Sequence, residues 1–216
     1  MIEMSSNSAA VPALWYPQSE QIVYEFTRET GLLRQYFGLY REECRIANGA
    51  KYRAADEDQT RRAHVLIARI GSKCIGGCRL SIRSEREAKP LPMETEQFQL
   101  EDHFPRLKRP GSCYGEISRL VLIPAFRNGR ASLEMWKRFC QRTVDLAVDV
   151  MFAAAPLINL RAYRKHCHSI GLDATIHRDV VVPPEPGFEH ITDYVLSCAV
   201  RELKSSRGTE AQELRH

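Results

Sequence analysis

The chain has 216 residues, a length typical of one globular domain. Hydrophobic residues make up 44% and charged residues 27%, close to the average for soluble proteins, which argues against an extensively disordered chain. The formal net charge of +4 is too small to indicate nucleic-acid binding by itself, and no run of about 18 apolar residues predicts a membrane-spanning helix.

The first residues lack the basic and apolar regions of a secretory signal, and seven cysteines are scattered through apolar segments. Both features favour a cytoplasmic protein with free thiols. We predict a loose arm over residues 1–17, one domain over 18–204 and a frayed tail over 205–216.

The N-terminal half predicts helices followed by strands. The apolar residues between Ile22 and Cys44 have helical spacing, which predicts two helices separated near Gly31. Strands are predicted over 64–69 and 74–82, and Gly76-Gly77 in the second strand indicates a bulge or the close approach of another segment.

A long charged and proline-containing segment occupies residues 84–109. Phe98, Leu100 and Phe104 are its expected apolar anchors. A segment of this length within one domain is typical of a functional or mobile loop.

The C-terminal half alternates strands and helices. A strand over 114–123 ends at Pro124, and an amphipathic helix follows over about residues 130–148. The remaining predicted elements are a strand over 150–155, a basic helix over 160–170 that ends at Gly171, and strands over 174–182 and 193–200. This order predicts a mixed α/β domain around one sheet.

Polar side chains interrupt the apolar pattern of the predicted strand over 114–123. Alternation places Glu116 and Ser118 on one face, with Ile117 and Arg119 on the other. A buried carboxylate needs a partner, so Glu116 is either half of a structural ion pair, for example with Arg79, or a general base or amine anchor in a cleft.

A turn bearing Arg127 and Gly129 precedes the long helix, and Arg130 lies in its first turn. Free N–H groups at a helix N-terminus suit an anionic group such as a pyrophosphate or phosphopantetheine phosphate, although an ordinary capped helix start has the same pattern. Further basic residues lie on this helix and on the predicted helix over 160–170. They form either a solvated face or a docking patch for an acidic carrier protein. They are Lys137, Arg138, Arg142, Arg161, Arg164 and Lys165.

The cysteines do not predict a metal site. Cys74 and Cys78 share a strand face but are too far apart for a local chelate, and His166-Cys167-His168 lacks the paired spacing of structural zinc sites. We interpret these cysteines as core thiols.

Four stretches resemble the GNAT-fold acyltransferases, specifically the acyl-homoserine-lactone synthase (LuxI-type) group with its related N-acyl amino acid synthases and exosortase-associated acyltransferases. They are Leu33–Cys44, which resembles an Arg-and-aromatic helix, the acidic pair around Ala55–Asp58, the Gly-x-x-Arg-Leu strand at Gly76–Leu80, and the Glu-x-[ST]-Arg strand at Gly115–Leu120. The resemblance spans roughly residues 20–135.

The resemblance implies N-acyl transfer from a thioester to an α-amine. Glu116 would act as the base, directly or through water, while a bulged strand from Ser118 to Val121 would offer N–H groups to the thioester oxygen. Arg79 or Arg119 would grip the acceptor carboxylate.

The resemblance also implies roles for further residues. Asp56 and Asp58 would orient the positive end of the acceptor, and Arg34 would order the N-terminal helices. The donor thioester would contact Val121 near the end of the strand, and the following turn and helix start at Arg127, Gly129, Arg130 and Ala131.

The coenzyme A loop of the family is only approximated, because Phe126 stands where a basic residue is usual and Arg127 comes one residue late. An acyl carrier protein donor and an amino-acid acceptor therefore fit best, with acyl-phosphopantetheine or acyl-CoA as co-substrate and no permanent cofactor. The alternatives are an acetyl-CoA-dependent N-acetyltransferase and a non-catalytic GNAT-like module that binds an acidic partner.

Overall fold

A computed structural model describes residues 21–48, 63–127, 129–184 and 188–200. The predicted arm over 1–17 and tail over 205–216 lie outside these residues. In the described part of the chain, no helix is long and apolar enough to cross a membrane.

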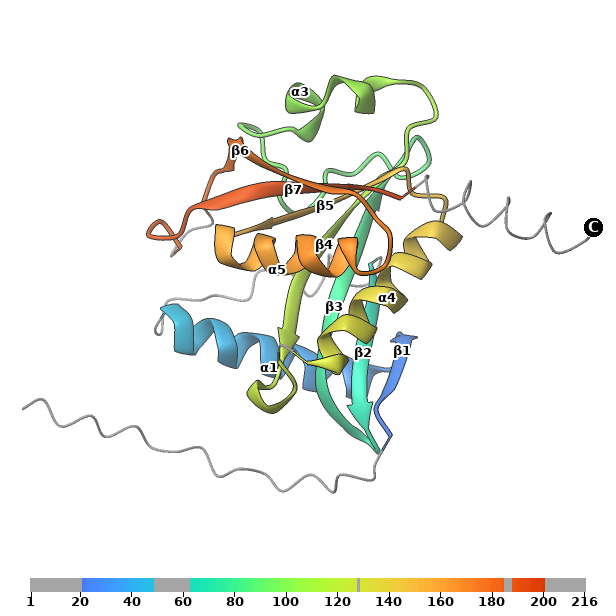
Figure 1. Cartoon of the computed structure of the whole chain (residues 1–216), viewed down its shortest axis with the longest axis vertical. Helices are drawn as coiled ribbons and strands as arrows, with labels where there is room; N and C mark the ends of the chain where they lie inside the picture. Colours follow the sequence, from blue (N-terminus) through green and yellow to red (C-terminus); the bar gives the residue numbers. More distant parts are fainter. Residues whose placement is uncertain (1–20, 49–62, 128, 185–187, 201–216) are drawn as a thin grey trace, which may run out of the picture.

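Seven strands form one mixed sheet in the order β1-β2-β3-β4-β5-β7-β6 (Figure 1). Their bounds are β1 Val23–Thr27, β2 His64–Ile70, β3 Lys73–Arg83, β4 Tyr114–Leu122, β5 Val150–Ala155, β6 Ala174–Val182 and β7 Asp193–Ala199. Only β4 and β5 are parallel; the other neighbours are antiparallel. The predicted mixed α/β fold is confirmed.

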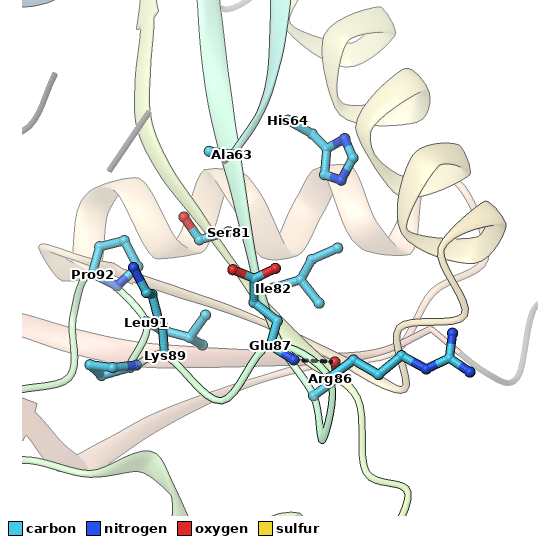
Figure 2. Close-up of a pocket in the computed structure, with 11 residues that line it drawn as sticks. Ala63, His64, Ser81, Ile82, Arg86, Glu87, Lys89, Leu91 and Pro92 are labelled. Atoms are coloured by element: carbon cyan, nitrogen blue, oxygen red, sulfur yellow. Dashed lines mark hydrogen bonds between the residues drawn. The ribbon is translucent and has the colours of Figure 1, made fainter. Parts of the chain in front are cut away.

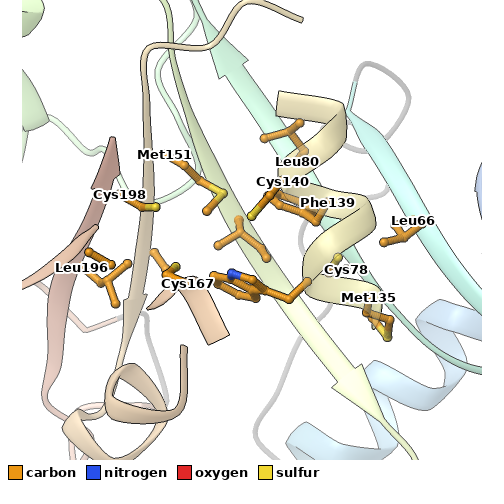
Figure 3. Packing of buried hydrophobic residues seen from close by; sticks show 14 of the residues in the cluster. Leu66, Cys78, Leu80, Met135, Phe139, Cys140, Met151, Cys167, Leu196 and Cys198 are labelled. Atoms are coloured by element: carbon orange, nitrogen blue, oxygen red, sulfur yellow. The ribbon is translucent and has the colours of Figure 1, made fainter. Parts of the chain in front are cut away.

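Helices cover both faces of this sheet. Helix α1 (Thr30–Asn48) packs through Tyr36 against β2, β3 and β4. Helices α4 (Arg130–Asp145) and α5 (Leu157–His168) cover the opposite face, where they enclose the largest apolar cluster with Trp136 and Phe139. Four cysteines contribute to that core (Figure 3): Cys78, Cys140, Cys167 and Cys198.

One predicted helix is wrong. The segment after Ile22 forms the edge strand β1, which pairs with β2, and only the second predicted helix exists, as α1. The Glu29 carboxylate accepts hydrogen bonds from the N–H groups of Gly31 and Leu32 at 2.7 and 3.0 Å. Gly31 therefore lies in the capped first turn of α1 and does not separate two helices.

The long segment over 84–109 is a folded layer of the structure. It contains α3 (Leu100–His103) and the 3₁₀ turn η2 (Pro105–Lys108), and its anchors Phe98 and Leu100 are buried, as predicted. Phe104 is partly buried against the same cluster. The segment packs on Tyr114, Phe152 and Val195, so it covers the part of the sheet that α1 leaves open (Figure 1).

Candidate active site

A β-bulge in β4 shapes the candidate site. Gly77 of β3 pairs with Val121 and Arg79 pairs with Ser118, so Arg119 and Leu120 lie opposite one β3 residue. Arg119 has a φ of 53°, in the left-handed region that non-glycine residues rarely adopt. The bulge predicted near Ser118–Val121 is confirmed.

The bulge also corrects the predicted faces of β4. Strict alternation places Arg119 with Ile117, against α4. In the structure the guanidinium carbon of Arg119 lies 5.0 Å from the ring centre of Tyr40 in α1, while Ile117 packs in the core under α4. Because the bulge adds a residue, Glu116, Ser118 and Arg119 all reach the α1 side of the sheet.

Tyr36 of α1 holds the bulge in place. Its buried hydroxyl donates a 2.7 Å hydrogen bond to the backbone oxygen of Arg119. Gly77 gives Tyr36 the necessary room, since a Cβ there would lie 2.5 Å from the Leu66 carbonyl oxygen and 2.9 Å from the Tyr36 ring. The Arg119–Leu120 peptide is trans, so the Leu120 N–H points away from Tyr36.

A pocket of about 540 Å³ opens beside the bulge, between α1 and the 84–109 segment. Its wall contains four of the predicted site residues: Arg79, Glu116, Ser118 and Arg119. Tyr40 of α1, Met93 of the long segment, Ala154 of β5 and Asp193 of β7 also line it. The structure therefore brings the predicted catalytic residues together with one predicted acceptor ligand.

Glu116 is the buried acid of this pocket, with 4% of its surface exposed. Burial raises its pKa to about 7, partly offset by the hydrogen bond from the Met93 N–H and by the positive charge of Arg79. The Met93 N–H donates to Glu116 Oε2 at 2.8 Å. A carboxyl group with a pKa near 7 can accept a proton from a bound amine near neutral pH.

Arg79 is fully buried under the same pocket. Its Nε donates to Ser118 Oγ at 3.1 Å, which fixes both side chains. The positive charges of Arg79 and Arg119 both lower the pKa of Glu116. The pocket thus brings the buried Glu116 carboxyl group together with two guanidinium groups, the set that an amino-acid zwitterion requires.

The neighbouring strands separate next to the bulge. The pairing of β4 with β5 ends at Ile117 and Ala153, although β4 continues to Leu122 and β5 to Ala155. The part of β4 that follows Ile117 is therefore free of β5, and the bulge lies in it. Backbone N–H groups at a bulge leave the regular ladder and become available to a ligand.

The predicted donor-binding residues lie at the end of β4 and in the turn and helix start that follow it. Val121 is buried in the α1 cluster, Gly129 is the N-cap of α4, and Arg130 and Ala131 form its first turn. Arg127 already has protein partners: its Nε donates to the Leu122 carbonyl oxygen at 2.7 Å, and its Nη2 lies 2.5 Å from Glu43 of α1. Arg127 therefore ties the turn to α1.

Other predicted site residues are not gathered in the pocket. Arg34 lies on an exposed part of α1 and does not line it. Asp56 and Asp58 lie outside the described residues.

Three contributors were missed by the sequence analysis: Tyr36, Tyr40 and Met93. Tyr36 and Tyr40 are four residues apart, so they share a face of α1, and Gly77 signalled the close approach of another segment. Met93 acts through its backbone N–H, for which a sequence carries no signal.

A second pocket of about 470 Å³ lies beyond Pro92, which lines both cavities (Figure 2). His64, Arg86 and Lys89 are its basic residues. The Arg86 side chain extends away from Lys89 (Figure 2), so these charges do not converge on one point. This pocket lacks the focused polar groups that are typical of a specific ligand site.

All seven cysteines lie among the described residues and are free thiols. Cys74 and Cys78 are buried, as predicted, but on opposite faces of β3, because Ile75 is an extra residue in the pairing with β2. The described part of the chain contains no group of three or more His, Cys, Asp or Glu side chains that could hold a metal ion.

The basic residues of α4 and α5 are mostly exposed. Lys137, Arg161, Arg164 and Lys165 are open to solvent, and Arg138 pairs with Glu134 at 3.0 Å. Arg142 is half-buried, with its guanidinium carbon 5.6 Å from the ring centre of Phe26. The exposed charges lie on the helices that cover the face opposite α1 and the pocket.

No family model matches the sequence, and a search of curated proteins finds no significant match. Solved structures do match. FeeM, an N-acyl amino acid synthase from uncultured soil microbes, has a TM-score of 0.60 at 11% identity, over 87% of this chain and 95% of its own.

Two acyl-homoserine lactone synthases are also similar. LasI has a TM-score of 0.54 at 12% identity, over 84% of this chain and 91% of its own. The CoA-dependent enzyme BjaI, solved with SAM and isopentyl-CoA, has a TM-score of 0.52 at 17% identity, over 78% of this chain and 76% of its own. Bacterial acetyltransferases, one described as a GNAT family member, are further matches. The chain therefore has the GNAT acyltransferase fold.

Proposed function

We propose that this chain is an N-acyltransferase that moves a fatty acyl group from a thioester to the α-amine of an amino acid or related amine. The observation that carries the proposal is the buried Glu116 carboxyl group, which shares a pocket with Arg79 and Arg119 beside the β4 bulge. The pocket volume of about 540 Å³ suits a small organic acceptor.

The proposed reaction is balanced by these groups. Glu116 takes a proton from the acceptor ammonium, and the free amine attacks the thioester carbon to form a C–N bond. N–H groups of the bulge, such as that of Leu120, stabilise the oxyanion. The C–S bond then breaks, and the departing thiolate takes the remaining proton of the amine, which yields an amide and a free thiol.

The acceptor is proposed to be an amino acid because both ends of a zwitterion find a partner. Its carboxylate pairs with Arg119 or Arg79, where a planar guanidinium provides two parallel hydrogen bonds. Its ammonium faces Glu116. The fold likeness to FeeM, an N-acyl amino acid synthase, supports the same class of acceptor.

We propose acyl carrier protein as the donor. The exposed cations on α4 and α5 suit an acidic carrier, and the separation of β4 from β5 gives a phosphopantetheine arm access from that side. Acyl-CoA is the alternative, supported by the likeness to the CoA-dependent synthase BjaI. Both donors and the free thiols are consistent with a cytoplasmic enzyme.

The experiment is mass spectrometry of lipid-soluble products from cells that express the wild-type chain or Glu116→Gln. We expect a new N-acyl amino acid or N-acyl lactone in the wild type only, and its mass identifies the acceptor and chain length. A product that persists undiminished in Glu116→Gln would remove Glu116 as the base. Binding of acyl carrier protein without any product, equal in both variants, would favour a non-catalytic module.

A further inference from the structure

A second buried acid lies next to the Glu116 pocket. Glu94 of the 84–109 segment has a fully buried side chain, and its carboxylate accepts three hydrogen bonds. The donors are the Leu91 N–H at 2.7 Å, the Leu100 N–H at 3.1 Å and Arg83 Nη1 at 2.9 Å. Three donors on one carboxylate hold a loop in a single geometry.

These bonds close a tight turn over Leu91-Pro92-Met93-Glu94. The Glu94 N–H donates to the Leu91 carbonyl oxygen at 2.8 Å, and proline occupies the second position, which β-turns favour. The N–H of the third residue, Met93, is the group that donates to Glu116 Oε2. The turn that Glu94 closes therefore presents a hydrogen-bond donor to the candidate base.

The turn is anchored to the sheet. Arg83, the last residue of β3, also lies 3.3 Å from Glu101, which in turn accepts a 2.9 Å hydrogen bond from the Tyr114 hydroxyl at the start of β4. Glu94 is thus held from the ends of the two strands that carry Arg79 and Glu116. This arrangement ties the position of Met93 to the floor of the pocket.

We propose that Glu94 is a positioning residue for Glu116: its carboxylate closes the Leu91–Glu94 turn and thereby aims the Met93 N–H at Glu116 Oε2. The inference deepens the proposed function, because it explains how the candidate base is held. The contact itself exists whether or not the chain transfers acyl groups, so the two claims can be tested separately.

Glu94 affects the pKa of Glu116 by two routes of opposite sign. The Met93 hydrogen bond lowers this pKa, whereas the negative charge of Glu94 raises it, and the hydrogen bond is the larger effect. The remaining charged groups around Glu116 are Arg79 of β3 and Arg119 of β4, with Glu96 and Asp193 elsewhere in the pocket wall.

Two substitutions separate these routes. Glu94→Asp keeps the charge but shortens the side chain, so the carboxylate withdraws from the turn and the Met93 contact weakens. Glu94→Gln removes the charge and keeps one oxygen, which can still accept from the Leu91 N–H and Arg83, whereas the bond from the Leu100 N–H is lost. We expect the titration midpoint of Glu116 to rise in Glu94→Asp and to fall in Glu94→Gln.

The measurement is NMR titration of the chain labelled with ¹³C at glutamate carboxyl carbons, with the Glu116 signal assigned by its loss in Glu116→Gln. The matched control is Glu85→Gln, an exposed residue of the same segment, which should leave the midpoint unchanged. In the wild type, the Met93 amide proton should titrate with the Glu116 midpoint and stop doing so in Glu116→Gln. This comparison of the Met93 amide proton in the wild type and in Glu116→Gln tests the contact between Met93 and Glu116 even if Glu94→Asp does not fold.

The inference would be overturned if the Glu116 midpoint shifted in the same direction in both Glu94 variants. It would also be overturned if the chemical shift of the Met93 amide proton did not change as Glu116 titrates. The pH profile of kcat/KM then separates it from the proposed function. If the Glu116 midpoint moves as expected but the rate profile does not follow, Glu94 positions Glu116 and Glu116 is not the base.

Discussion

At neutral pH the ionised form of the buried Glu116 carboxyl group lowers the free energy of unfolding. Its pKa rises from 4.5 in the unfolded chain to about 7 in the fold, because the ionised carboxylate is removed from water. Between these two values the folded state binds more protons than the unfolded state, so stability falls as pH rises through this window. Such a destabilising charge is typical of a functional group.

This difference predicts that Glu116→Gln stabilises the protein at high pH. At pH 8 the variant avoids a buried charge, and we expect its free energy of unfolding to exceed that of the wild type by about 3 kcal/mol. Near pH 4.5 the folded wild type is protonated, so the gain should largely disappear. Chemical denaturation at both pH values measures this, and a variant less stable than wild type at pH 8 would show that Glu116 is part of a stabilising ion pair.

Tyr36 links helix α1 to the bulge of strand β4, so its substitution tests whether this contact between the two elements holds the bulge in place. Tyr36→Phe removes the hydrogen bond to the Arg119 carbonyl oxygen. We expect a loss of about 1 kcal/mol in stability and of about tenfold in kcat/KM, because the bulge peptide is no longer fixed.

The matched control for Tyr36→Phe is Tyr163→Phe on α5, at the opposite face of the sheet, which should keep full activity. Thermal unfolding and steady-state kinetics measure both variants. If both substitutions lower kcat/KM equally, Tyr36 has no special role in the site.

The sequence allowed most elements to be predicted, and the failures have physical causes. The strands from His64 to Ala199 were predicted because their apolar runs are bounded by glycine, proline and charged residues. The strand β1 was mistaken for a helix, since the four-residue spacing of Ile22 and Phe26 fits a helical face as well as an edge strand.

Register was harder to predict than element type. The bulge was expected, but its effect on Arg119, which moves to the face of Glu116, depends on pairing with β3. Likewise, the extra residue Ile75 places Cys74 and Cys78 on opposite faces of β3, although alternation predicts the same face. A single inserted residue changes the face of every residue after it, and its exact position depends on the pairing with the neighbouring strand.

The whole molecule assembles the pocket from segments far apart in the sequence. The pocket takes Tyr40 from α1, Met93 from the long segment, Glu116 from β4 and Asp193 from β7. The strand residues were predictable from their polarity in an apolar run. Contributions from loops and helices depend on packing over long sequence distances, which one sequence does not encode in a readable pattern.

The candidate pocket and the exposed cations lie on opposite faces of the sheet. The pocket lies on the side of α1, whereas the exposed cations lie on α4 and α5 across the sheet. We expect the acceptor and the acyl donor to approach from opposite faces and to meet where β4 separates from β5.

The most direct test of this account is the release of free thiol from acyl carrier protein or CoA thioesters by the purified chain, in the presence of a mixture of amino acids. We predict thiol release that depends on an amine and increases with pH through about 7, as Glu116 loses its proton. Glu116→Gln should lower the rate by about 10²–10⁴-fold, while Glu85→Gln leaves it unchanged. Amine-dependent release that is equal in wild type and Glu116→Gln, or no release with any donor, would contradict the account.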